Sequence, residues 1–229
     1  MNFIQNQEHV DTNVTGSHEQ FWVFSQVSQW GQPWPYSDET YLNKVRQIVI
    51  QVRSIGIKNN HPARMVHIAQ MLIWRYYLKV HDEDTSIIEP ALLSAAQFLE
   101  IQKSHESQMH QNQDPSKKSS EFMQQIKLLK SLDLNIKINH PSEYLSHFVT
   151  SQFGVRQYQL AECIISDSFL SPCCLLHKPV TIAEGAAIMA AGMTDLPDAA
   201  IPRTVQSISF IKDMKFFYRQ SSSVQPGGM

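Results

Sequence analysis

The apolar residues of this chain recur every three to four positions in one segment after another, which is the period of an α-helix. The first series runs from Val45 to Ile55, and a nearly unbroken one runs from Met65 to Tyr76. Further series cover residues 92–99, 122–132, 144–148, 160–165, 182–191 and 205–218. No segment shows sustained alternation of period two, because the closest, residues 135–138, is too short to pair alone. The pattern therefore predicts an all-α fold.

The most informative stretch lies in the second half of the chain. A helix ending in Asp167-Ser168 is followed by a short apolar crossover, and then by a helix rich in Gly and Ala around Gly185. Small residues let neighbouring backbones approach closely, so we expect this second helix at the centre of a bundle. Thr181 and Glu184 match the T-x-x-E pattern of a capping box at its start.

Three segments of the chain differ from this periodic body. Residues 1–20 are polar and predict a loose tail. Aromatic residues follow between Phe21 and Tyr36, and we expect this arm to dock on the body of the chain or on a partner, because such side chains are costly to leave in water. Residues 104–120 are polar and predict a surface loop.

Composition excludes several classes of function. The formal net charge of −2 over 229 residues argues against nucleic acid as the main partner, because phosphate binding needs clustered Lys and Arg. No apolar run approaches 18 residues, so we expect no membrane span. The first 20 residues lack the basic and apolar regions of a signal peptide. Three cysteines make no disulfide framework, which favours a reducing compartment.

Candidate chemistry is sparse. Cys173, Cys174 and His177 form at most a poor half of a zinc site, so packing in the core is the favoured interpretation. His105 and His110 fall in a polar loop, and no H-E-x-x-H, Gly-x-Ser-x-Gly or phosphate-binding glycine motif occurs. No catalytic residue, cofactor or metal is therefore predicted. Arg46, on an apolar helix face, would need a carboxylate or carbonyl partner if buried.

Several short motifs follow one another in a recognisable order. They are Arg46-Gln47, Ile68-Ala69 with Trp74-Arg75-Tyr76-Tyr77-Leu78, Glu89-Pro90-Ala91-Leu92-Leu93 with Ala95-Ala96-Gln97-Phe98-Leu99, Leu128-Leu129-Lys130-Ser131-Leu132 with Ile138-Asn139-His140-Pro141, and the Asp167-Ser168 stretch. Their joint order resembles the cyclins of the transcriptional type, similar to cyclins T, K, L and C. The resemblance covers about residues 41–150 and again about residues 155–219.

The resemblance implies two cyclin-box repeats of about five helices each, the second more degenerate. Residues 1–35 would form the tail and aromatic arm, 36–151 the first box, 152–219 the second repeat, and 220–229 a disordered C-terminus. It also implies a regulatory subunit that is not itself an enzyme. The partner would be a cyclin-dependent kinase acting on the C-terminal repeats of RNA polymerase II. The implied location is the nucleus, with the cytoplasm as a second one.

The expected kinase interface comprises Phe98, Leu99, Gln102, Lys103, Glu106 and Gln125. Cyclins that activate kinases carry a lysine after the Phe-Leu of the third helix and a glutamate in the next helix. Direct alignment puts Gln102 and Gln125 at these positions, and a slip of one residue restores Lys103 and brings Glu106 into place. No similar slip restores the glutamate.

Three other functions stay open. The departures at Gln102 and Gln125 favour a cyclin-fold scaffold or adaptor that activates no kinase. A cyclin-like transcription factor that touches DNA would need a basic face, and Lys212, Lys215 and Arg219 are few for that. An all-α enzyme would need a deep pocket with perturbed acids and bases.

Overall fold

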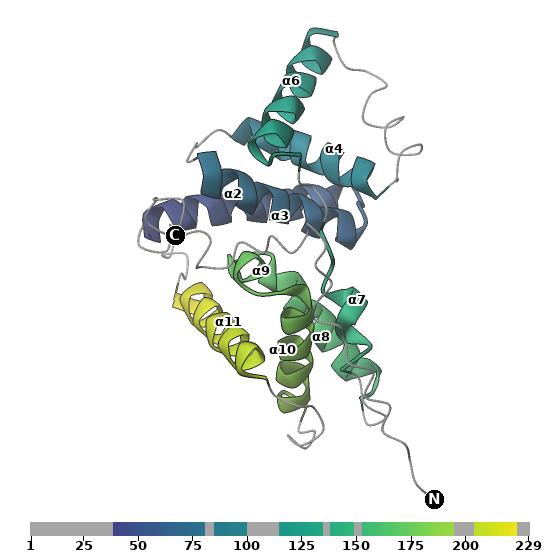
Figure 1. Ribbon diagram of the computed structural model, residues 1–229, viewed down its shortest axis with the longest axis vertical. Coiled ribbons are helices and arrows are strands. Elements are labelled where there is room, and N and C mark those ends of the chain that lie inside the picture. The colour runs from purple at the N-terminus through teal and green to yellow at the C-terminus, as the bar shows by residue number, and fades with distance from the viewer. Residues whose placement is uncertain are drawn as a thin grey trace, which may run out of the picture.

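The computed structural model describes residues 39–80, 85–99, 115–134, 138–148, 153–194 and 204–223. Within these ranges all regular structure is helical and no strand occurs, which confirms the predicted all-α fold. The helices form two groups, one above the other (Figure 1). The predicted tail and aromatic arm lie outside the described residues, and so do residues 104–114 of the predicted loop. Residues 115–120 belong to α6, so the prediction of a loop is wrong there.

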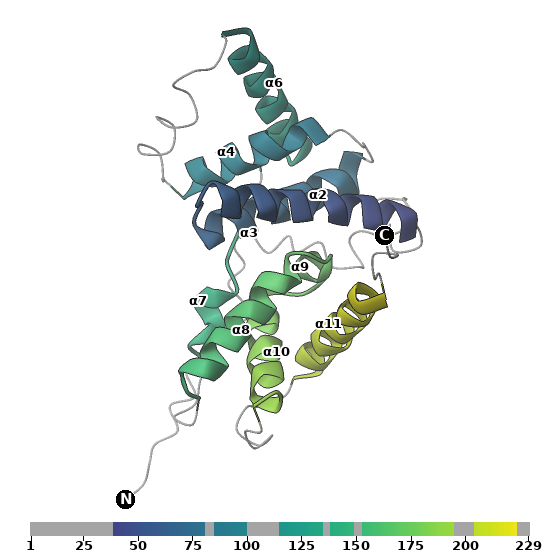
Figure 2. The same cartoon turned by 180° about the vertical axis from the view of Figure 1, so that it is seen from behind.

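The first group is built around one buried helix. It contains α2 (Glu39–Lys58), α3 (Ala63–Val80), a short 3-10 turn η2 (Thr85–Ile87), α4 (Ile88–Phe98) and α6 (Pro115–Ser131). Every residue from 65 to 77 of α3 is buried, because α2 and α4 pack on it and α9 approaches from the other group. α6 packs mainly on α4 and extends away from the body (Figure 2).

The crossing of α2 on α3 depends on a glycine near the end of α2. A Cβ atom on Gly56 would lie 2.3 Å from Cγ2 of Val66, which is closer than two non-bonded carbon atoms can approach. The absence of a side chain at Gly56 therefore sets how closely these two helices pack.

The second group is built around the small-residue helix. It contains α7 (Ser142–Leu145), α8 (Val155–Ser168), α9 (Cys173–Leu176), α10 (Pro179–Gly192) and α11 (Val205–Ser223). α7, α8 and α11 all pack on α10, and residues 181–191 are buried without exception. The expectation that this helix occupies the centre of a bundle is confirmed.

Two features lie near the expected boundaries of the repeats. α7 falls within residues 36–151, expected to form the first box, but it packs on α10 of the second group. α11 continues to Ser223, past residue 219, where a disordered C-terminus was expected to begin. The boundaries themselves stay predictions.

The predicted capping box at Thr181 and Glu184 is wrong. α10 begins at Pro179, with Lys178 as its N-cap, so Thr181 already lies inside the first turn. The Glu184 carboxylate accepts hydrogen bonds from Thr204 instead, at 2.8 Å from its backbone N and 2.9 Å from its Oγ1. Glu184 therefore connects the middle of α10 to the start of α11.

The apolar crossover lies in the core. Cys173 and Cys174 are buried, and burial raises the pKa of Cys173 to about 12 and that of Cys174 well above its ordinary value, so both stay thiols. His177 Nε2 lies 2.7 Å from Asp213 Oδ2 on α11. Within the described ranges no group of three or more His, Cys, Asp and Glu side chains could hold a metal ion, and no helix is long and apolar enough to cross a membrane.

Candidate functional site: the α4–α6 surface and the junction between the repeats

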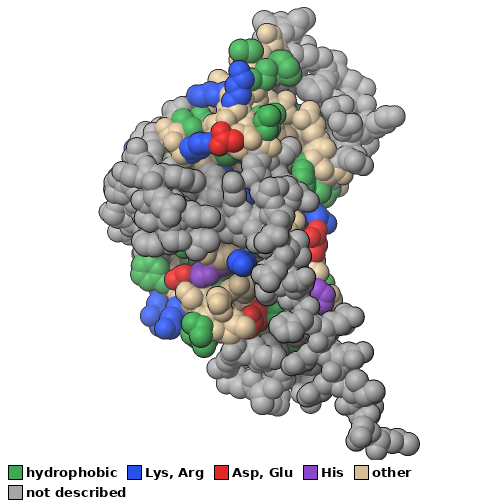
Figure 3. All heavy atoms as spheres, viewed as in Figure 1, with side chains coloured by type: hydrophobic (Ala, Val, Ile, Leu, Met, Phe, Trp, Pro, Cys, Tyr) green, Lys and Arg blue, Asp and Glu red, His purple; other side chains and the backbone are tan. Residues whose placement is uncertain are grey.

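The predicted interface falls on the surface formed by α4 and α6. Phe98 and Leu99, at the C-terminal end of α4, are half-buried and pack against the core with one side. On α6, Phe122 and Met123 are each 61 % exposed. In the space-filling view green apolar and blue basic side chains lie together over α6 (Figure 3). This end of the molecule therefore presents apolar surface that its own fold leaves uncovered.

Gln125 faces α4 rather than solvent. Its side chain is 8 % exposed, and its Nε2 donates hydrogen bonds to Ser94 Oγ at 3.2 Å and Gln97 Oε1 at 2.9 Å. Both donor hydrogens of the amide are thus used within the chain. A partner that accepts a hydrogen bond from this amide would have to replace Ser94 or Gln97. Gln102, Lys103 and Glu106 lie outside the described residues and stay predictions.

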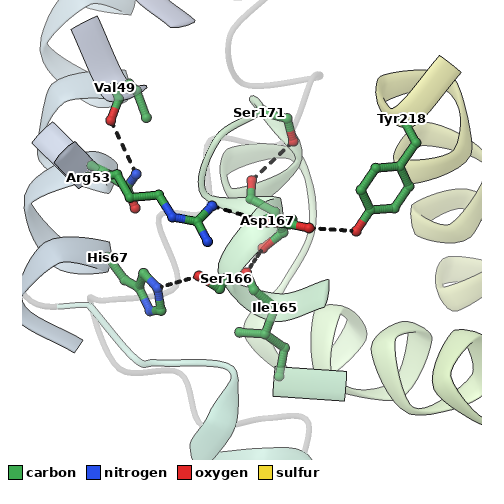
Figure 4. Close-up of polar contacts among 10 residues, drawn as sticks. Val49, Arg53, His67, Ile165, Ser166, Asp167, Ser171 and Tyr218 are labelled. Atoms are coloured by element: carbon green, nitrogen blue, oxygen red, sulfur yellow. Dashed lines mark hydrogen bonds and ion pairs between the residues drawn. The ribbon is translucent and has the colours of Figure 1, made fainter. Parts of the chain in front are cut away.

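A separate site, made of polar side chains, lies where the two groups of helices meet. Arg53 of α2 contacts Asp167 of α8, with Nη1 and Oδ1 3.1 Å apart. The hydroxyl of Tyr218, on α11, donates to the other oxygen of Asp167, also at 3.1 Å (Figure 4). Asp167 belongs to the Asp-Ser pair that ends α8, so this carboxylate links α2 of the first group of helices to α8 and α11 of the second.

A pair of buried histidines extends the junction. Nδ1 of His67, on α3, lies 2.9 Å from Nε2 of His140, and His67 Nε2 lies 2.9 Å from Ser166 Oγ. Both rings are nearly parallel to the ring of Phe169, with centroids 4.7 Å and 5.3 Å from it. Ser166 precedes Asp167, so the histidine pair and the arginine contact converge on the same end of α8.

The bond directions fix the tautomers of the neutral histidines. The backbone N–H of Ser142 donates to His140 Nδ1, so the proton of His140 is on Nε2 and is donated to His67. His67 accepts it on Nδ1, and therefore carries its own proton on Nε2 and donates it to Ser166. Every nitrogen of the two rings already donates or accepts a hydrogen bond. A second proton on either ring would therefore break one of these bonds.

Burial opposes the charged form of both histidines. Burial is the main cause that lowers the pKa of His67 to about 3. Repulsion from His140 in its protonated form and from Arg53 lowers this pKa further. Burial and the charge of Arg64 lower the pKa of His140 to about 4. Both rings are therefore neutral near pH 7, as the hydrogen-bond chain requires.

Arg46 also helps to join α2 to α11. Its guanidinium carbon lies 4.5 Å from the centroid of the Phe217 ring, an arrangement typical of a cation–π contact. Burial lowers the pKa of Arg46 from its ordinary value. The sequence predicted a carboxylate or carbonyl partner, and the structure adds this aromatic one.

His67, His140, Arg53 and Tyr218 were not predicted from the sequence. His67 and His140 are 73 positions apart, and no local pattern connects them. One signal did exist: His67 stands between Met65 and Ile68 in the strongest apolar series of the chain, so a buried histidine needing polar partners was foreseeable there.

We expect the contact between Arg53 and Asp167 to contribute measurably to stability. A double-mutant cycle of Arg53→Met and Asp167→Asn in urea unfolding should give a coupling energy of about 0.5–1 kcal/mol, because both side chains are about one-third exposed. The matched control is the Lys79–Asp133 pair, whose aspartate is 80 % exposed and whose coupling should be smaller. Equal coupling energies would show that the junction pair is no more than a surface ion pair.

Comparison with known proteins relies on the fold. No family model matches this sequence, and no curated protein is similar enough in sequence to be matched. Among solved structures, a chain of the yeast TFIIK (Kin28/Ccl1/Tfb3) complex superposes with a TM-score of 0.64 at 16 % identity, covering 88 % of this chain and 98 % of that one.

Two further structures agree. A chain of the yeast RNA Pol II CTD kinase CTDK-1 complex gives a TM-score of 0.63 at 16 % identity, over 86 % of this chain and 72 % of that one. A chain of the CAK complex of Chaetomium thermophilum, bound to ATP-gamma-S, superposes with a TM-score of 0.63 at 11 % identity, covering 90 % of this chain and 78 % of that one. These neighbours are cyclin subunits, and the chain has the cyclin fold.

Proposed function

We propose that this protein is a regulatory cyclin subunit that binds and activates a cyclin-dependent kinase. The kinase would be a transcriptional one that acts on the C-terminal repeats of RNA polymerase II. The complex would act in the nucleus. The proposal is supported by the shared fold, since the similar chains belong to kinase complexes, one of which is named for the polymerase C-terminal domain.

The observation that carries the proposal is the uncovered apolar surface of α4 and α6. Phe122 and Met123 are exposed on α6, which packs on α4, and the C-terminal end of α4 carries the half-buried Phe98 and Leu99. Exposed apolar side chains grouped in this way mark a protein-binding surface. The chemistry would belong to the kinase.

The mechanism would be positional. An active kinase needs the glutamate of its αC helix paired with the lysine that holds the ATP phosphates. A rigid helical surface that binds the αC helix in that position favours the active arrangement, because its binding energy shifts the population toward the state it fits. Phe122 and Met123 would supply apolar contact, and Phe98 and Leu99 would form the edge of the same surface.

A second function, a scaffold that holds proteins together without activating a kinase, is favoured by Gln125. The resemblance places a glutamate of kinase-activating cyclins at this position, whereas Gln125 is buried and bonded to Ser94 and Gln97. The two functions share the surface and differ in what binding does to kinase activity.

The test is co-expression of the full chain with a panel of transcriptional cyclin-dependent kinases, capture through a tag on this chain, and assay on a polymerase C-terminal-repeat peptide. Capture with activity supports the regulatory subunit. Capture without activity supports the scaffold. A folded chain that captures no kinase contradicts the kinase-binding proposal.

The contact surface is tested by Phe122→Ser/Met123→Ser. Both side chains are mostly exposed, so the fold should survive while affinity for the kinase falls at least about tenfold. Val155→Ser is the matched control, because Val155 is 76 % exposed at the start of α8, in the second group of helices. Equal losses in both variants would locate the interface elsewhere. Gln125→Ala should affect activation more than capture if the kinase reaches that position.

A further inference from the structure

α11 carries a second face that the fold leaves uncovered. Its inner side buries Phe210, Met214 and Phe217 against the second group of helices. Its outer side carries three apolar and three basic residues, all exposed and spaced i, i+3, i+7, i+10, i+11 and i+14: Val205, Ile208, Lys212, Lys215, Phe216 and Arg219. In the space-filling view blue and green side chains lie together over α11, at the lower left (Figure 3).

The charge of this outer face is not neutralised by its own helix. Asp213 is the one acidic residue of α11, and its carboxylate is held by His177. Among the described side chains, none forms an ion pair with Lys212, Lys215 or Arg219. Val205 is 81 % and Phe216 59 % exposed. The face therefore fits an occupant that is both acidic and apolar.

One segment of the chain itself has that composition. Residues 1–38 contain Glu8, Asp11, Glu19 and Asp38, and no Lys or Arg. The same residues hold six large aromatic side chains between Phe21 and Tyr36, including three of the four tryptophans of the chain. This composition complements the basic and apolar outer face of α11.

The position where this segment joins the fold also fits. The segment leads into α2 at Glu39, and Arg46, two turns further on, lies over Phe217 near the C-terminal end of α11. Both ribbon views place the start of α2 beside that end of α11 (Figures 1 and 2). α11 is about 28 Å long, and the segment from Glu8 to Asp38 can extend to about 100 Å, so both its aromatic residues and the carboxylates before them can reach the outer face of α11.

We propose that residues 1–38 dock on the outer face of α11. The aromatic side chains contact Val205, Ile208 and Phe216, and the carboxylates contact the three basic residues. Because the segment continues into α2, this docking ties the first repeat to the last helix of the second. It is independent of whether the α4–α6 surface binds a kinase.

The test uses tryptophan fluorescence of the full chain. Trp74 is buried in the core, so a change in quenching by acrylamide, a neutral quencher, reports mainly on Trp22, Trp30 and Trp34. We expect Lys212→Glu/Lys215→Glu to raise the fraction of fluorescence that acrylamide quenches and to shift the emission to longer wavelength. Combining it with Glu8→Lys/Asp11→Lys/Glu19→Lys should restore the wild-type values.

The matched control is Lys58→Glu/Lys130→Glu, which makes the same change of charge at exposed positions on α2 and α6. It should leave the quenching unchanged. Equal quenching in wild type and the α11 variant, or failure of the charge swap to restore it, would overturn the proposal. The proposal would also be overturned if the wild type dimerised or bound anionic vesicles and the α11 variant lost that binding with unchanged quenching. The occupant of the face would then be a second copy of the chain or a lipid surface.

Discussion

Lowering the pH from 7 to 5 should reduce the free energy of unfolding by about 3–4 kcal/mol, through His67 and His140. In the unfolded chain each ring takes up a proton with a pKa near 6.5, whereas the folded pKa values are about 3 and about 4. Between those values the unfolded state binds more protons than the folded state. Stability is therefore full above pH 6.5 and falls as the pH decreases toward 3.

The size of the effect follows from the distance between pH 5 and the unfolded pKa. Each pKa unit corresponds to about 1.4 kcal/mol, so 1.5 units give about 2 kcal/mol for each histidine. Both rings are nearly fully buried, at 8 % and 4 % exposed, so solvent screens the effect little. A loss of this size is a large share of the stability of a typical domain, about 5–15 kcal/mol.

The measurement is urea unfolding, followed by circular dichroism, at pH 7 and pH 5. The variant His67→Gln removes one of the two titrating rings and should lose about 2 kcal/mol less than the wild type over this interval. His147→Gln is the matched control, because His147 is exposed and its loss should leave the pH dependence intact. If His67→Gln and the wild type lose equal stability, the buried pair is not the cause.

The apolar periodicity was sufficient to predict the helical class, and the small residues of α10 were sufficient to predict its central place. Each helix has to bury one face, and α10, with Gly185 and five alanines, has no face suited to solvent. These properties are local, so a sequence carries them directly. The end of α8 at Asp167-Ser168 was predictable for the same reason.

The polar contacts were less predictable because their partners lie far apart in the chain. Glu184 bonds to Thr204 twenty positions later, and the T-x-x-E spacing suggested a local role instead. Pro179 was the better signal, since proline favours the first turn of a helix and puts the start before Thr181. At the candidate interface, sequence placed Phe98 and Gln125 on adjacent helices, yet it could not show that Gln125 is turned inward by Ser94 and Gln97.

Gly185→Ala should destabilise the protein by about 1–3 kcal/mol, although alanine favours helices. A Cβ atom at Gly185 would lie 2.3 Å from Cδ1 and 3.0 Å from Cε1 of Phe210. Phe210 is fully buried on the inner face of α11, so its ring has no space to move into. The clash would push α11 away from α10 and strain the contact between Glu184 and Thr204.

Gly192→Ala on the same helix provides the matched control. Nothing lies within 4 Å of a Cβ atom there, so the substitution tests the helix propensity of alanine without a clash, and stability should stay equal or rise slightly. The difference between the two variants in urea unfolding therefore isolates the steric cost at the α10–α11 contact. If Gly185→Ala were as stable as Gly192→Ala, α11 would not be held closely on α10, and the central place of α10 in the second group of helices would need revision.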